Sequence, residues 1–229
     1  MGLIVAAADI GRDSLQAAHW VFRRIKGGLG VATVAANAVF AAVTGISIAS
    51  AAIFSRVAVP PLIEHGYTPR FSVGLVAGSS VLGMLIPPSL LLINYGLVAE
   101  VSINALFIAA IIPGLLLSGA FAVIVIVIGW LKPPFAIAST TKAGSGVGID
   151  GKTALRKAIP VLCLLFLVLG GIYGGVFTPT EAGAIGALFA FLIALAMRRV
   201  GFEQSAHFFF SAARTSAAIL FLIIAASAF

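Results

Sequence analysis

The stretch FSVGLVAGSSVLGMLIPPSLLLINYGLVA, residues 71–99, is long and apolar enough to cross a membrane, but its centre is unsuited to one continuous helix. Pro87 and Pro88 lack an N–H, and each ring clashes with the carbonyl four residues earlier, so the carbonyls of Gly83 and Met84 lose their helical partners. We therefore predict a discontinuous helix, in which an unwound segment near mid-membrane joins two half-helices. The alternative is a simple proline kink with small residues packed against neighbouring helices.

The composition of the whole chain agrees with a membrane location for this segment. Of 229 residues, 61% are hydrophobic and 9% are charged, whereas about a quarter of the residues in a soluble domain are charged. One cysteine, Cys163, allows no internal disulfide. These values exclude a soluble globular domain, a disordered chain and a disulfide scaffold, and they predict an all-α polytopic membrane protein.

Apolar runs divide the chain into candidate membrane segments. Residues 27–55, 71–99 and 101–131 contain no charged residue, and residues 158–197 contain only Glu181. Since a crossing needs about 20 residues, 101–131 is predicted as one spanning helix and 158–197 as two. The last run, 215–229, reaches only about 22 Å at ~1.5 Å per residue. We expect it to be a truncated helix, and the chain to be a fragment.

Basic residues indicate the topology. All 14 Lys and Arg lie before residue 27, at 56–70, at 132–157 or after 197, and none lies at the junctions near Glu100 and Glu181. The positive-inside rule makes these four segments cytoplasmic, including a loop at 132–157, and leaves no role for nucleic-acid binding. Run 27–55 then begins and ends on one side, which predicts a re-entrant hairpin turning at Thr44-Gly45-Ile46-Ser47. An ordinary crossing helix over 27–55 is the alternative.

A broken helix beside a hairpin tip would offer oxygen ligands in a place that water does not reach. Transporters use unwound carbonyls to bind a cation and half-helix N-termini to face an anionic substrate. Neither the hairpin run nor the broken-helix run contains a carboxylate. Neutral oxygens suit a desolvated Na⁺ better than a proton relay.

Two stretches, GSSVLGMLIPPSLLLINYGLVAEVSINALFIAAIIPGLLL (78–117) and GGIYGGVFTPTEAGAIGALFA (170–190), resemble the large membrane subunit of the tripartite ATP-independent periplasmic (TRAP) transporters. The resemblance implies a multi-pass protein of the bacterial inner membrane. It also implies a secondary transporter that imports organic acids, of the dicarboxylate or acidic-sugar type, by symport with Na⁺ and without any other cofactor. The implied partners are a periplasmic substrate-binding protein, a small membrane subunit and the lipid bilayer.

The resemblance further implies an elevator mechanism, with this chain as the first half of an inverted repeat. The hairpin tip and the broken helix would form one cation site comprising Thr44, Gly45, Ser47, Ser79, Ser80, Gly83 and Met84. The substrate-site region would comprise Pro87, Pro88, Ser89 and Thr180. The chain departs from the family at Ile46, where a serine is usual, and in having no second Pro-Pro motif within a mid-membrane run.

The segment Thr178-Pro179-Thr180-Glu181 has the pattern of a helix N-terminal capping box. Thr178 would be the N-cap, and Glu181, three residues later, would accept a hydrogen bond from its N–H. A structural cap explains this carboxylate without a transport role; a direct role in handling the ion or substrate is the alternative.

Other functions remain as competing hypotheses. A different inverted-repeat Na⁺/anion symporter would share the hairpin and the broken helix, but it would not need a binding protein. A non-transporting structural fragment would form no complete site. An enzyme is not expected, because His19, His65 and His207 lie in predicted loops and no His-Glu-x-x-His zinc motif occurs.

Overall fold

A computed structural model describes residues 4–5, 8–25, 27–131, 136 and 150–197, together with residues 210, 212–214, 216–218, 220, 221 and 224. The regular structure in these residues is helical, and they contain no strand. In chain order the helices are α2 (Ile10–Phe22), α3 (Gly28–Thr44), α4 (Ser47–Val57), α5 (Val59–Glu64), α6 (Pro69–Ser80), α7 (Leu82–Leu85), α8 (Leu90–Val98), α9 (Ile103–Leu131), α10 (Gly151–Tyr173) and α11 (Pro179–Ala196).

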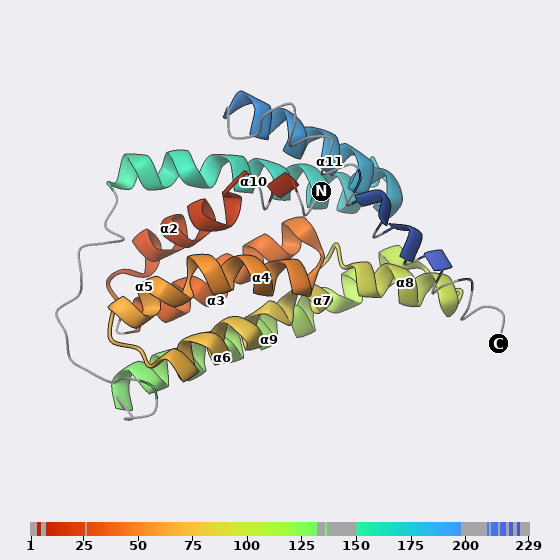
Figure 1. Cartoon of the computed structure of the whole chain (residues 1–229). Coiled ribbons are helices and arrows are strands. Elements are labelled where there is room, and N and C mark those ends of the chain that lie inside the picture. The colour runs from red at the N-terminus through yellow and green to blue at the C-terminus, as the bar shows by residue number, and fades with distance from the viewer. Residues whose placement is uncertain are drawn as a thin grey trace.

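Helix α3 is the centre of the fold (Figure 1). It packs against α2 and α10 on one side and against α6, α7 and α9 on the other, while α4 folds back along it. Most of its residues are buried, as expected for a helix that is apolar all round. Its small residues let neighbours approach closely: a Cβ on Gly30 would lie 2.6 Å from a side-chain carbon of Val125 in α9.

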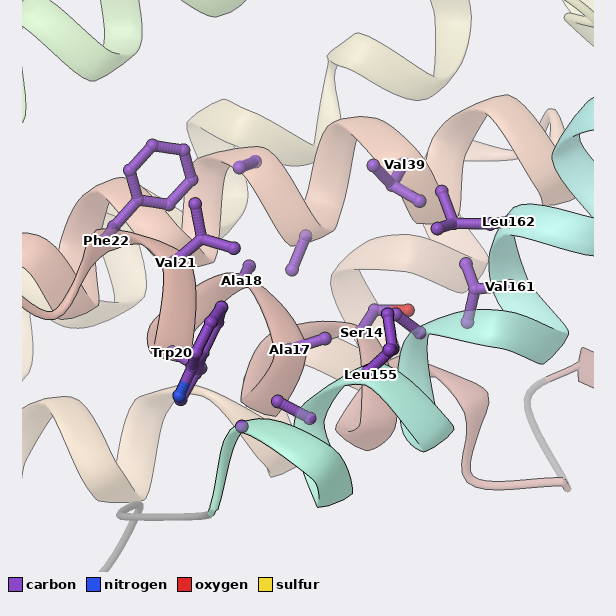
Figure 2. A pocket seen from close by; sticks show the side chains of 15 residues that line it. Ser14, Ala17, Ala18, Trp20, Val21, Phe22, Val39, Leu155, Val161 and Leu162 are labelled. Atoms are coloured by element: carbon purple, nitrogen blue, oxygen red, sulfur yellow. The ribbon is translucent and has the colours of Figure 1, made fainter.

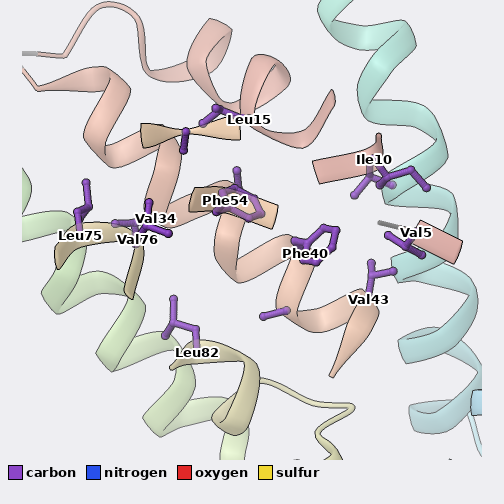
Figure 3. Packing of buried hydrophobic residues seen from close by; sticks show 14 of the residues in the cluster. Val5, Ile10, Leu15, Val34, Phe40, Val43, Phe54, Leu75, Val76 and Leu82 are labelled. Carbon is purple, nitrogen blue, oxygen red and sulfur yellow. The ribbon is translucent and has the colours of Figure 1, made fainter. Parts of the chain in front are cut away.

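The main hydrophobic core takes most of its residues from the first half of the chain, and α9, α10 and α11 add a few more. Figure 3 shows side chains from α2, α3, α4, α6 and α7 meeting in one cluster. Phe40 of α3 and Phe54 of α4 are both fully buried, and their rings pack edge-to-face with centroids 5.6 Å apart. This contact holds the two helices antiparallel, so residues 27–55 form a helical hairpin rather than one continuous helix.

Within the described residues, three helices are long and apolar enough to cross a membrane, namely α9, α10 and α11. The broken pair α6–α7 and α8, bent by 42°, would make a fourth span if it is counted as one. Large apolar side chains on these helices are exposed, among them Ile112, Leu116, Phe166 and Leu192. Such surfaces are suited to lipid, and the chain is an all-α polytopic membrane protein.

Two details of the sequence analysis were wrong. Residues 151–157, expected in a loop, form the first two turns of α10, because Lys157 faces α2, where its Nζ lies 3.3 Å from the carboxylate of buried Asp13. His19, also expected in a loop, lies in the last turn of α2, with its ring centroid 6.0 Å from that of His65. Charged residues ended the apolar runs but did not end the helices.

Some predictions fall outside the described residues. These are His207, most of the loop at 132–157, and most of the truncated helix at 215–229.

Candidate cation site

The hairpin tip is a two-residue turn between α3 and α4. Gly45 has φ +66° and donates its N–H to the carbonyl of Ala41 at 2.8 Å, which ends α3. Ile46 is extended, and α4 begins at Ser47. The hydroxyl of Thr44 is buried and donates to the carbonyl of Phe40 at 2.9 Å. The turn therefore needs glycine at position 45, since a left-handed conformation is unfavourable for other residues.

The break in the second helix lies between α7 and α8. Ile86 is extended, and the two prolines, Pro87 and Pro88, separate it from Ser89 at the start of α8. The carbonyl of Met84 cannot receive a helical hydrogen bond from Pro88, which has no N–H. Instead the hydroxyl of Ser89, which is fully buried, donates to this carbonyl at 2.7 Å. Ser89 thus satisfies a backbone group that the break leaves open.

The hairpin tip packs directly on the helix break. The N–H of Leu90 donates to the carbonyl of Gly45 at 3.1 Å. A Cβ on Gly45 would lie 2.2 Å from the carbonyl oxygen of Pro88, and a Cβ on Gly83 would lie 3.0 Å from the backbone N and Cα of Ser47. Two glycines, one on each side, therefore allow two interrupted backbones to touch. The contact brings together Gly45 and Ser47 with Gly83 and the segment from Pro88.

Ser79 and Ser80 lie one turn away from this contact, buried at the end of α6. Each hydroxyl donates to its own helix, Ser79 to the carbonyl of Leu75 at 2.7 Å and Ser80 to that of Val76 at 2.6 Å. Both hydroxyls also face the side-chain amide of Asn37 in α3, 2.6 Å away for Ser79 and 3.3 Å for Ser80.

Asn37 and its third side-chain partner, Ser50 of α4, were missed by the sequence analysis. The Ser50 hydroxyl donates to the side-chain oxygen of Asn37. Both residues are fully buried. The sequence could have indicated Asn37, because it is the only asparagine in the charge-free run 27–55. A buried amide needs hydrogen-bond partners for all its polar groups, so this residue can be expected to contact other polar side chains.

The remaining predicted site residues lie at the start of α11. The Thr178 hydroxyl accepts from the N–H of Glu181 at 3.3 Å, and the Glu181 carboxylate accepts from the N–H of Thr178 at 2.8 Å. This is the capping-box geometry. Thr180 is exposed, and its hydroxyl lies 3.2 Å from that of Thr178. No described contact joins Thr180 to the hairpin tip or the helix break, so it stands apart from the other candidates.

The site offers neutral oxygens. Between residues 27 and 99 the only acidic side chain is Glu64, in α5. In the part of the chain that the structure describes, no group of three or more His, Cys, Asp or Glu side chains could hold a metal ion. The contact region can therefore supply carbonyl and hydroxyl oxygens, which are ligands for a hard monovalent cation and not for a transition metal.

Cavities lie both beside this contact and away from it. One of about 280 Å³ lies beside Pro87 and is lined by residues of α3, α9 and α10, almost all of them apolar. Another of about 450 Å³ lies away from the hairpin tip, between α2, α3 and α10, where Trp20, Ala17 and Leu162 face it (Figure 2). A further cavity of about 380 Å³ lies at the end of α4 opposite the hairpin tip, and its lining includes Arg12, Arg56 and Glu64. The first two linings carry no charged group that would hold an organic anion, so neither adds a substrate site to the contact region.

Comparison with known families identifies the protein class. The family model for the DctM component of the tripartite ATP-independent periplasmic transporters matches residues 1–229. The chain belongs to this family.

Curated members of the DctM family are similar along much of the chain. The C4-dicarboxylate TRAP transporter large permease protein DctM of Pseudomonas aeruginosa is 34% identical over 86% of this chain and 45% of its own length. The ectoine TRAP transporter large permease protein TeaC of Halomonas elongata is 35% identical over 83% of this chain and 45% of its own. The isethionate TRAP transporter permease protein DctMQ of Oleidesulfovibrio alaskensis is 33% identical over the whole chain and 35% of its own.

This DctM-family chain thus spans about half the length, or less, of the curated relatives it matches. Its family and its long apolar helices make it a multi-pass protein of the bacterial inner membrane. The hairpin tip and the broken helix both lie in the part shared with these relatives.

Proposed function

We propose that this chain is part of the permease of a Na⁺-coupled secondary transporter that imports organic acids. A periplasmic binding protein would deliver the substrate, and a small membrane subunit would complete the complex. The DctM family supports a tripartite transport system, and relatives are named for C4-dicarboxylate, ectoine and isethionate. The observation that carries the proposal is the contact between the hairpin tip and the helix break.

The proposed cation ligands lie around this contact. The carbonyl of Gly45 accepts one hydrogen bond from Leu90, and a carbonyl oxygen has two lone pairs. It could therefore face Na⁺ together with the Ser47 hydroxyl and the backbone oxygens at Gly83 and Met84. Thr44, Ser79 and Ser80 would support these ligands, because their hydroxyls already donate to their own helices.

The substrate would bind beside the cation, at the start of α8. The first N–H groups of a helix point at a ligand there, and the helix dipole favours negative charge. Pro87, Pro88 and Ser89 would shape this side of the site and keep the backbone unwound. A bound Na⁺ a few ångströms away would offset the charge of an organic anion, which couples the two fluxes.

The hairpin would be re-entrant and would belong to the first half of an inverted repeat. Helices α3 and α4 have 17 and 11 residues, or about 26 Å and 17 Å at ~1.5 Å per residue. Both are shorter than a hydrocarbon core of about 30 Å. A hairpin whose tip stops at mid-membrane would move with the broken helix as one transport unit, as an elevator requires.

Uptake by the assembled transporter that contains this chain tests the proposal. The complex is reconstituted into liposomes, its binding protein is added outside, and entry of a radiolabelled C4-dicarboxylate is followed under an inward Na⁺ or choline gradient. We expect uptake only with Na⁺ and with the binding protein; ectoine and isethionate are then tried as competitors.

The other outcomes separate the competing functions. Equal uptake under the Na⁺ and choline gradients would rule out Na⁺ coupling. Uptake without the binding protein would favour a different inverted-repeat symporter. No uptake of any tested acid by the complete complex would favour a structural role.

A further inference from the structure

A buried polar cluster lies beneath the hairpin tip and links three helices. It consists of Asn37 from α3, Ser50 from α4, and Ser79 and Ser80 from α6. No more than 3% of the surface of any of these residues is exposed. Polar side chains are costly in an apolar interior unless every group is hydrogen-bonded. Apolar side chains such as alanine or leucine would avoid this cost, but they could not form hydrogen bonds between the three helices.

The hydrogen bonds show that Asn37 is the centre of the cluster. Its amide nitrogen donates to Ser79 at 2.6 Å and faces Ser80 at 3.3 Å, and its oxygen accepts from Ser50. The serine hydroxyls of α6 also donate to carbonyls of their own helix, so they present only acceptor lone pairs to Asn37. One amide therefore uses its donor side to hold α6 and its acceptor side to hold α4.

We propose that Asn37 is a positioning residue that sets the hairpin tip in register with the helix break. The inference rests on the proposed Na⁺ site at that contact. Asn37 would not touch the ion. It would fix how far α6 and α4 slide along α3, and thereby whether the carbonyl of Gly45 meets Leu90 and whether Gly83 meets Ser47.

The spacing along the helices supports this coupling. Asn37 lies eight residues before Gly45, or about 12 Å along α3 at ~1.5 Å per residue. Ser50 lies three residues after Ser47, and Ser79 lies four residues before Gly83. Each of these helical segments connects the cluster to the contact between the hairpin tip and the helix break. Because the segments are short, a displacement of the helix at the cluster moves the contact by a similar amount.

The matched control is Thr33, one turn before Asn37 on the same helix. Thr33 is also fully buried, but its hydroxyl donates within α3, to the carbonyl of Leu29 at 2.9 Å. The variant Thr33→Val removes a buried polar group of α3 without cutting a link to another helix. Asn37→Ala removes the links to α4 and α6 together.

Two measurements on the assembled transporter test the proposal. The first is the Na⁺ concentration that gives half-maximal uptake. We expect a rise of about tenfold for Asn37→Ala, about 1.4 kcal/mol, with the maximal rate at saturating Na⁺ within twofold of wild type. Thr33→Val should stay within twofold in both quantities. The second is hydrogen exchange of the peptide containing Leu90, which should speed up in Asn37→Ala and not in Thr33→Val.

A role confined to overall stability would give a different result. Asn37→Ala would then lower the amount of folded protein, but the folded fraction would show wild-type half-saturation and wild-type exchange at Leu90, and the proposal would be overturned. If Asn37→Ala does not fold, the same measurements are made on Ser50→Ala. This variant removes the hydrogen bond between Asn37 and α4 and keeps the link from Asn37 to α6. A rise of two- to threefold in half-saturation supports the proposal, and an unchanged value refutes it.

Failure of the proposed function is distinguishable from failure of this inference. Na⁺-independent uptake by the wild-type complex would refute the cation site. The exchange at Leu90 would still report whether Asn37 holds the hairpin tip against the helix break.

Discussion

Replacing Gly45 by alanine puts a side chain into the contact between the hairpin tip and the helix break. The new Cβ would lie 2.2 Å from the carbonyl oxygen of Pro88, whereas ordinary carbon–oxygen contacts are about 3.3 Å or longer. The two backbones must therefore separate by about 1 Å.

The expected cost has two parts. A residue other than glycine in the left-handed region, where Gly45 has φ +66°, costs about 1–2 kcal/mol. Forcing extra volume into a packed interior costs about 1–3 kcal/mol. Together these give a loss of about 2–5 kcal/mol, or roughly 4–20 °C in the unfolding midpoint at about 2–4 °C per kcal/mol.

The control is Gly74→Ala, a glycine of α6 where a Cβ would meet no described atom within 4 Å. Alanine at such a helical position is expected to stabilise by about 0.5–1 kcal/mol. Both variants are compared with wild type by thermal unfolding in detergent and by Na⁺-driven uptake in the assembled transporter. Gly45→Ala should also lower Na⁺-driven uptake, because separating the two backbones moves the oxygens proposed to bind Na⁺.

Equal behaviour of the two alanine variants would contradict a close contact at Gly45. If Gly45→Ala unfolds within 2 °C of Gly74→Ala and transports equally well, the hairpin tip does not press on the helix break.

Three further predictions concern the rest of the fold. Lys157→Met removes the cation 3.3 Å from the buried carboxylate of Asp13 and should cost about 1.5–3 kcal/mol, seen as a lower unfolding midpoint that Lys157→Arg largely restores. Thr178→Ala removes the N-cap of α11 and should cost about 0.5–2 kcal/mol; Thr178→Ser should stay close to wild type, and a neutral alanine variant would contradict the cap. Burial, and secondly the neighbouring His65, lower the pKa of His19 below its ordinary 6.5. As pH falls, the unfolded chain therefore takes up a proton on this imidazole at a higher pH than the folded chain does. The fold should lose stability as pH falls below about 6.5, and His19→Gln, scanned from pH 8 to pH 5, should show a flatter profile than wild type.

The two interruptions of the helical pattern could be predicted from the sequence, the hairpin from the positions of the basic residues along the chain and the helix break from its prolines. A glycine between two apolar arms ends α3 at Thr44, and the Pro87-Pro88 pair separates α7 from α8. Proline and glycine act through their own backbone geometry, so the exact place of each interruption needs no knowledge of neighbouring helices.

The cluster around Asn37 could not be found in the same way. Its partners are 13, 42 and 43 residues away in the chain, and only the packing of α3 against α4 and α6 brings them together. Thr180 shows the reverse case: it lies in a stretch that resembles the transporter family, but the fold places it at an exposed helix start. The start of α10 was misplaced for a related reason, since Lys157 is charged but packs against α2.

Whether Na⁺ binds where the hairpin tip meets the helix break is tested most simply by hydrogen exchange of the purified transporter with and without Na⁺, using K⁺ at equal ionic strength as the reference. We expect Na⁺ to slow exchange in peptides covering residues 44–48 and 83–91 and to leave the start of α11, at residues 178–182, unchanged. Unaltered exchange in both of the first two peptides, or protection confined to other segments, would show that the contact between hairpin tip and helix break is not where Na⁺ binds.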